Sequence, residues 1–320
     1  MKTYIGSSTN EQIRFKATSG GVGSSIVKYL LDKKIVDYAL SFEYDSASLS
    51  YIPCLIKSFS DYKICGSIYQ EIDLIRQLKL MLSNKSGGGK IVFFSLPCQT
   101  RALKKICIDA GYEPLTIGLT CSSQQSHEAT SYLLSRLKIR ENEVEKIQYR
   151  GNGWPSGIQI KKKDGNEIFI KNNGSIWTRI FHSRLFIQPR CFSCTNTLND
   201  YADIVLADPW LKKYTDEEKI GKTLFATYTK VGESCVNGSI KAGYITAELI
   251  DNETLYYSQR TTIKRKKAYK AHPKMRCRMS KLFLSRKYIK LAKLPFFFGI
   301  HCHIKNWIEY FMTKKKSSSL

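Results

Sequence analysis

The chain has 320 residues, of which 42% are hydrophobic and 12% aromatic, so it can bury a core as one large domain or two smaller ones and is not a disordered protein. Its formal net charge of +24 is unevenly distributed, because residues 260–320 hold 18 Lys and Arg residues and one acid, Glu309. Such a basic segment implies an anionic partner, although a solvated charged face without a partner is the plainer alternative.

The first residues lack the apolar stretch of a signal peptide, and histidines and charged residues interrupt the longest apolar stretch, 291–312. We therefore expect a cytoplasmic protein without a transmembrane helix. In a reducing compartment, the ten cysteines serve as ligands or catalysts more often than as disulfides.

The first 140 residues alternate between expected strands and helices. Helices are expected at 22–33, 70–84, 99–110 and 127–138, and strands at 36–42, 90–96 and 115–120, with a breaker at 86–89. The run KIVFFSL is apolar almost throughout, which is typical of a strand buried on both faces. This alternation predicts an α/β fold with a mainly parallel sheet in residues 1–145.

The middle of the chain, residues 146–258, has a different pattern. It begins with a glycine-rich loop at 149–157 and a hairpin at 158–171 around Asp164-Gly165, and continues with a helix at 176–186 and strands at 203–208 and 223–230. We expect a mixed α+β part here, followed by a basic, partly helical C-terminal tail at 259–320.

Two cysteines follow neighbouring strands directly. Cys98 comes after the strand at 90–96, just before the helix that begins at Gln99, and Cys121 comes after the next strand. The carboxyl ends of parallel strands are where α/β sheets place their chemistry, and a helix N-terminus stabilises a thiolate. The alternative for each cysteine alone is a small buried apolar side chain.

A second pair of cysteines, Cys191 and Cys194, forms a C-x-x-C whose spacing can present two sulfurs to one metal or cluster. Four thiolates suit a [4Fe–4S] cluster or tetrahedral zinc, and a redox dithiol is a further alternative. A zinc ribbon would normally show a second C-x-x-C, which this sequence lacks.

Seven blocks occur in an order that is specific to one family. They are ATSGGV (17–22), GSIYQ (66–70), VFFSLPCQTRALKK (92–105), LTCSS (119–123), YRGNGWP (149–155), RCFSC (190–194) and YADIVLADPW (201–210). The segment GKTLFATYTKVGES (221–234) resembles the strand that follows them in the family. Over about residues 14 to 240 the chain resembles the coenzyme F-420 hydrogenase/dehydrogenase beta subunit family, which includes related formate dehydrogenase and chlorophyll reductase proteins. It looks like a standalone member without the ferredoxin-like N-terminal segment that many members carry.

The resemblance implies FAD beside a [4Fe–4S] cluster on Cys98, Cys121, Cys191 and Cys194, with residues 1–145 as the flavin-binding half. The residues implied for cofactor binding are Ser19, Gly20, Gly21, Gly66, Ser67, Tyr69, Gln99, Arg150, Asn152, Gly153, Trp154 and Asp208. The glycines at 20–21 open a helix and could expose backbone N–H groups to a pyrophosphate, but a plain helix cap is the alternative. Likewise, residues 151–154 could form a mere turn, and Asp203 and Asp208 could merely solvate the ends of a strand.

The function that this implies is an oxidoreductase that takes electrons from an acidic carrier such as ferredoxin, or from a reduced deazaflavin, and acts on a small organic substrate. A role in surface polysaccharide biosynthesis is an expectation by analogy with the family. The basic tail could dock the carrier or touch anionic lipid, whereas no nucleic-acid motif accompanies it. The rival hypotheses are a non-catalytic accessory protein of the same fold, which binds a partner through the tail, and a structural zinc protein.

Overall fold

The computed structural model describes residues 1–83 and 87–314, and its main feature is one eight-stranded sheet. The strands are β1 (Lys2–Ser8), β2 (Tyr38–Asp45), β3 (Ser50–Ile56), β4 (Gly89–Ser95), β5 (Tyr112–Leu119), β9 (Ile204–Ala207), β10 (Thr223–Thr227) and β11 (Ile245–Ile250). Their order is β11-β1-β10-β9-β5-β4-β2-β3. Strands β2, β4, β5 and β9 run parallel in the centre, whereas both flanks pair antiparallel.

The α/β class is therefore confirmed, with a mixed sheet whose parallel part is central. Helices α2 (Val22–Asp32) and α8 (Lys230–Lys241) cover one face, and α3 (Leu74–Ser83), α4 (Thr100–Asp109) and α9 (Glu253–Ser258) cover the other. In β4, Val92 packs toward the first face while Ile91 and Phe93 pack toward the second. This double burial explains the unbroken apolar run of that strand.

A second, three-stranded sheet follows from the middle of the chain: β6 (Val144–Gln148), β7 (Gly157–Lys162) and β8 (Glu167–Lys171). The hairpin predicted at Asp164-Gly165 joins β7 to β8, and Gly165 adopts a φ of 87° at its turn. Helices α5 (His127–Arg136) and α6 (Ile176–His182) share a core with this sheet.

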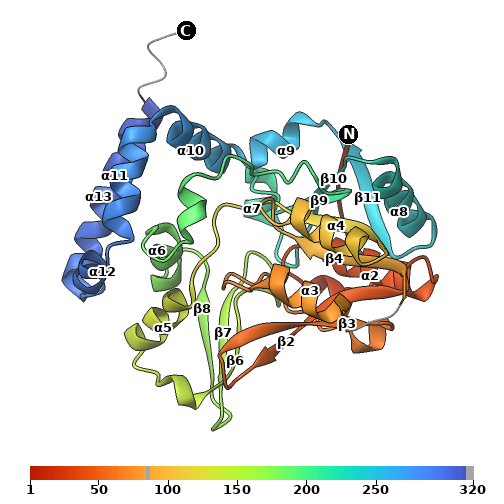
Figure 1. The fold of residues 1–320 in the computed structure, drawn as a ribbon, viewed down its shortest axis with the longest axis horizontal. Helices are drawn as coiled ribbons and strands as arrows, with labels where there is room; N and C mark the ends of the chain where they lie inside the picture. The colour runs from red at the N-terminus through yellow and green to blue at the C-terminus, as the bar shows by residue number, and fades with distance from the viewer. Residues whose placement is uncertain (84–86, 315–320) are drawn as a thin grey trace.

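The basic C-terminal segment is helical along its described length and packs on the body. It consists of α10 (Arg260–Ala271), α11 (Pro273–Phe283), α12 (Arg286–Ala292) and α13 (Pro295–Lys314). Phe298 of α13 joins the core of α5 and α6, while Phe283 and Met312 join a core with Phe192. In Figure 1 these blue helices lie at one end of the molecule, beside α5 and α6 and opposite α8 and β11.

Some details differ from the expectations. The helix predicted at 70–84 begins only at Leu74, and the predicted breaker begins on residue 86, which lies outside the described residues. Strands β1, β3, β6 and β11 were not anticipated. For β1 and β11 the reason is distance, since the partners of β1 lie more than 200 residues away in sequence. The described residues contain no helix that is long and apolar enough to cross a membrane.

The sheet draws strands from both sides of residue 145, since β9, β10 and β11 join β1, β2, β4 and β5. The division of the chain into domains at 1–145, 146–258 and 259–320 stays a prediction.

Candidate functional site

All four predicted cluster ligands line one small cavity of about 150 Å³. Cys98 follows β4 and Cys121 follows β5, and these strands pair in parallel up to Ser95 and Gly118, so their ends lie together. Cys191 belongs to a short 3₁₀ helix, Pro189–Phe192, that starts with a proline, and Cys194 follows it. The fold therefore brings two separate parts of the chain to the predicted edge of the sheet.

A buried lysine forms part of the wall of this small cavity. Lys266 of α10 is 3% exposed, and its ammonium donates to the carbonyl oxygens of Cys121 (2.9 Å) and Asn196 (2.6 Å). The same ammonium lies 3.3 Å from the sulfur of Cys194. The sequence offers no signal for this residue, since it is one of 18 cations in the C-terminal segment.

The chemistry of these thiols favours an occupant with positive charge. Burial raises the pKa of Cys121 to about 12 and also raises the pKa of Cys191, so neither becomes a thiolate at neutral pH without a cation to compensate. Within residues 1–83 and 87–314, no group of three or more His, Cys, Asp or Glu side chains is arranged to hold a single metal ion.

A zinc ion would require its sulfur ligands to converge on one point, at about 2.3 Å from the metal. A [4Fe–4S] cluster takes one thiolate at each iron, so its ligands surround a larger volume. Four sulfurs around a small cavity fit the cluster better than zinc.

A much larger cavity, of about 1250 Å³, adjoins the small one. The two share Leu96, Cys121, Ser122, Ser123, Gln124 and Arg190 in their walls. Of the residues predicted to bind a cofactor, eight line the large cavity: Ser19, Gly21, Gly66, Ser67, Tyr69, Gln99, Arg150 and Asp208. Its volume exceeds the roughly 300–1,000 Å³ of ordinary ligand pockets, so it has room for more than one ligand.

The start of α2 forms one wall of the large cavity. Gly21 caps this helix in the left-handed conformation without a side-chain hydrogen bond, and Val22, Gly23 and Ser24 line the cavity. The free N–H groups of the first turn suit a diphosphate. Gly20 does not line the cavity, and a Cβ there would lie 2.8 Å from the Cα of Lys222, so close packing explains this glycine.

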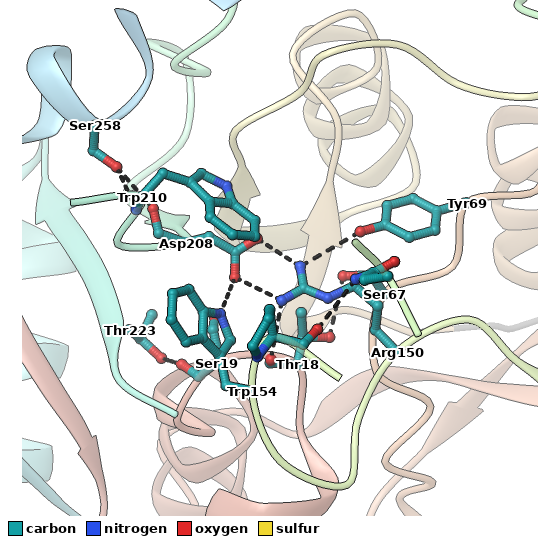
Figure 2. Close-up of polar contacts among 12 residues, drawn as sticks. Thr18, Ser19, Ser67, Tyr69, Arg150, Trp154, Asp208, Trp210, Thr223 and Ser258 are labelled. Carbon is teal, nitrogen blue, oxygen red and sulfur yellow. Dashed lines mark hydrogen bonds and ion pairs between the residues drawn. The ribbon is translucent and has the colours of Figure 1, made fainter. Parts of the chain in front are cut away.

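Arg150 and Asp208 form a buried ion pair in the wall of the large cavity (Figure 2). Arg150 is 1% exposed, and its guanidinium donates to both oxygens of Asp208, at 2.6 and 3.0 Å. It also reaches Tyr69 Oη and the carbonyl oxygen of Thr18, both at 3.4 Å. Burial alone would lower the pKa of Arg150, but Asp208 and Tyr69 raise it above its usual value, so the guanidinium stays charged.

Two tryptophans flank this pair, as Figure 2 shows. The indole N–H of Trp154 donates to Asp208 (3.1 Å), and its ring centroid lies 5.2 Å from that of Trp210. Trp210 lines the cavity whereas Trp154 lies behind the pair. Trp154 therefore positions Asp208 and does not face the cavity.

The remaining predicted residues lie away from the cavity wall. Asn152 is exposed and donates to Gln159 Oε1 (2.7 Å), while Gly153 donates its N–H to the carbonyl of Phe15 (2.9 Å). Asp203 accepts from Thr116 (2.6 Å) and Thr229 (3.0 Å) near the ends of β5 and β9, which fits a structural role.

The C-terminal helices form part of the wall of the large cavity, which the sequence analysis did not predict. Just before α10, Ser258 Oγ at the end of α9 and Gln259 Nε2 donate to the carbonyl of Asp208 (2.9 and 3.1 Å). Further along α10, Arg265 donates to Ser122, next to Cys121. Helix α10 therefore runs from the ion pair to the cysteine cavity.

Two family models match the chain: the N-terminal part of the coenzyme F420 hydrogenase/dehydrogenase beta subunit at residues 3–79, and its C terminus at residues 88–253. A chain of the F420-reducing [NiFe] hydrogenase complex from Methanosarcina barkeri, studied by xenon derivatization, has a similar fold, with a TM-score of 0.63 and 19% identity. The similarity covers 83% of this chain and 90% of that one. Helices α10 to α13 follow residue 253 and lie outside both matched ranges.

Proposed function

This chain belongs to the coenzyme F420 hydrogenase/dehydrogenase beta subunit family, and from that premise we propose that it is a flavin- and [4Fe–4S]-dependent oxidoreductase. It passes electrons between an iron–sulfur or deazaflavin donor and a small organic substrate, with surface polysaccharide biosynthesis as the suggested setting. The observation that carries the proposal is the position of the cysteine cavity, which adjoins the large cavity lined by eight of the twelve residues predicted to bind a cofactor.

In this proposal Cys98, Cys121, Cys191 and Cys194 hold the cluster, and the first turn of α2 holds the flavin diphosphate. When bound, the flavin would supply hydride exchange and the cluster one-electron transfer. The protein side chains keep the two sites adjacent. Arg150 and Asp208 fix the loop at 150–154 against residues 208–210, and α10 covers both cavities.

Anaerobic purification followed by iron, sulfide and flavin analysis tests the proposal. The protein should be brown and contain one cluster and one flavin per chain, and the reduced sample should give the paramagnetic resonance spectrum of a [4Fe–4S] cluster. Zinc without acid-labile sulfide would favour the structural zinc protein. A colourless protein without either group would favour the accessory protein of the same fold.

Lys266 gives a prediction about the cluster itself. Replacing Lys266 with Met removes a positive charge next to Cys194, so the extra electron of the reduced cluster is less stable and the midpoint potential should fall by on the order of tens of millivolts. Potentiometric titration followed by paramagnetic resonance measures this shift. Lys267→Met, one residue further on the exposed side of α10, is the matched control. An unchanged potential in a fully loaded Lys266→Met protein would exclude the role.

The proposed location is the cytoplasm, with one face resting on anionic lipid. Helix α13 exposes a stripe of large apolar side chains with helical spacing: Phe296, Phe297, Ile300, Ile304, Trp307 and Phe311. Phe296 is 75% exposed and Trp307 is 63% exposed. The preceding helices α11 and α12 expose basic residues, and this combination suits an anionic membrane surface better than an apolar protein partner.

The double variant Phe296→Ser/Trp307→Ser should bind anionic vesicles at least about tenfold more weakly, because both rings lose their burial in lipid. Vesicle sedimentation with anionic and with neutral lipid measures the effect. Phe169→Ser, a change at an exposed aromatic residue on β8, is the control. Equal binding of all variants would contradict the lipid surface, and concentration-dependent self-association would assign the stripe to a second copy of the chain instead.

A further inference from the structure

Three buried cationic side chains line the large cavity near Ser122 and Ser123, which follow Cys121. Arg184, Arg265 and Lys305 all line the cavity and are each less than a tenth exposed. They come from separate elements: Arg184 follows α6, Arg265 belongs to α10 and Lys305 belongs to α13. The protein therefore folds three distant segments to place positive charge in one spot.

The neighbours of these cations do not balance their charge. Glu309 lies 3.4 Å from Arg184 Nε and 3.1 Å from Lys305 Nζ, and the hydroxyl of Tyr269 donates to it. The other partners are neutral, since Arg184 donates to Ser123 Oγ (2.8 Å) and Arg265 donates to Ser122 Oγ (2.9 Å) and to the Ser122 carbonyl (3.1 Å). One carboxylate among three cations leaves an excess of two positive charges.

The whole cavity has the same imbalance. Among the described residues that line it, eight are Lys or Arg and two are Asp or Glu, and one of these two, Asp208, is paired with Arg150. Burial and, to a smaller extent, the adjacent Arg184 lower the pKa of Arg265 to about 10. Burial also lowers the pKa of Lys305, despite the opposing effect of Glu309. Arg184 moreover has a φ of 64°, which is unfavourable for an arginine.

Uncompensated buried charge is costly, so an arrangement of this kind indicates a counter-ion that binds there. A phosphate carries about −1.5 to −2 at neutral pH, which matches the excess of two charges better than a single carboxylate does. Two arginines also provide the planar donors that recognise phosphate oxygens.

We infer that Arg184, Arg265 and Lys305 form a binding site for the phosphate group of a ligand, adjacent to the cysteine cavity. Two of the three cations, Arg265 and Lys305, come from α10 and α13, which lie outside the ranges matched by the family models, whereas Arg184 lies within the matched range 88–253. Because the first turn of α2 is assigned to the flavin diphosphate, the phosphate bound here belongs to a phosphorylated substrate. As a statement about substrate class, the inference rests on the proposed function, whereas the site itself does not.

Inorganic phosphate is the probe, and isothermal titration calorimetry on the full chain, both flavin-depleted and flavin-loaded, is the measurement. Arg265→Met and Lys305→Met should each weaken phosphate binding by about tenfold or more, because each removes a charge-assisted hydrogen bond. Lys267→Met removes one charge from the exposed side of the same helix and should change binding by less than about twofold.

Glu309→Gln gives a test of opposite sign. Loss of this carboxylate leaves three cations unbalanced, so phosphate should bind more tightly while the melting temperature of the phosphate-free protein falls. A merely structural role for Glu309 would lower stability without tightening phosphate binding.

The flavin content of the variants then identifies the source of the phosphate. If flavin-loaded protein still binds phosphate and Arg265→Met keeps its flavin, the site serves a phosphorylated substrate. If flavin loading blocks phosphate and Arg265→Met loses flavin, the site holds the cofactor diphosphate instead, which overturns both the substrate assignment and the assignment of that diphosphate to α2. Failure of the flavin-depleted protein to bind phosphate, or equal binding by all variants, overturns the inference. Absence of flavin and iron from the purified protein would contradict the proposed function but leave the phosphate titration valid.

Discussion

The Cys191→Ala variant is expected to contain no intact [4Fe–4S] cluster, whereas the proposed function predicts one per chain in the wild-type protein purified without oxygen. Cys191 lines the cavity with three other cysteines, and its sulfur accepts from the Gln124 N–H at 3.5 Å. A cluster that loses one of four thiolates loses an iron ligand that this cavity cannot replace, because its other lining residues offer no thiol or carboxylate. Iron and sulfide analysis and the absorbance near 400 nm measure the loss.

Cys277→Ala is the matched control, since Cys277 is an exposed cysteine on α11 outside both cavities. It should leave iron, sulfide and absorbance unchanged. The same melting temperature for the metal-free forms of both variants would show that the effect of Cys191→Ala is not a failure to fold. Full iron and sulfide content in Cys191→Ala would remove this residue from the ligand set.

The second large effect is expected at the buried ion pair. Asp208→Asn leaves the Arg150 guanidinium charged and without its carboxylate partner, and breaking a buried pair in this way costs about 3 kcal/mol or more. Trp154 loses the charged acceptor of its indole N–H in the same variant. We expect a lower free energy of unfolding in urea and a loss of flavin, because this pair fixes one wall of the large cavity.

A double-mutant cycle separates the pair from its surroundings. Arg150→Met/Asp208→Asn should be less destabilised than the sum of its single variants, because no unpaired charge remains. Asp109→Asn, which breaks an exposed pair with Lys105 on α4, should leave the urea midpoint unchanged. If Asp208→Asn is as harmless as Asp109→Asn, the pair does not stabilise the cavity wall.

Local patterns were sufficient to predict much of this protein. Buried strands such as β4 and the Asp164-Gly165 hairpin have signals within a few residues, and the structure confirms both. The sequence also predicted that Cys98 and Cys121 lie at one edge of the sheet. Each follows the carboxyl end of its strand, and β4 and β5 pair in parallel, so both ends lie at the same edge.

Other features depend on pairings between distant segments. Strand β1 lies between β10 and β11, and nothing in its own residues identifies partners so far away. Arg150 was predicted to bind a cofactor and lines the large cavity, but nothing in the sequence indicated that its guanidinium donates to both oxygens of Asp208, 58 residues later. Gly66 lines the large cavity, and a Cβ there would lie 1.9 Å from the Arg150 carbonyl, so contact with this distant segment also requires a glycine at position 66.

The sequence by itself determined the α/β class, the family blocks and the four cysteines, because each depends on residue type and short spacing along the chain. Only the tertiary structure decided what the basic segment does. It selects Arg265, Lys266 and Lys305 from 18 similar cations and buries them against the two cavities. Charge composition cannot make that selection, because which lysine faces a cysteine sulfur depends on how α10 and α13 pack against loops that lie 70 or more residues earlier in the chain.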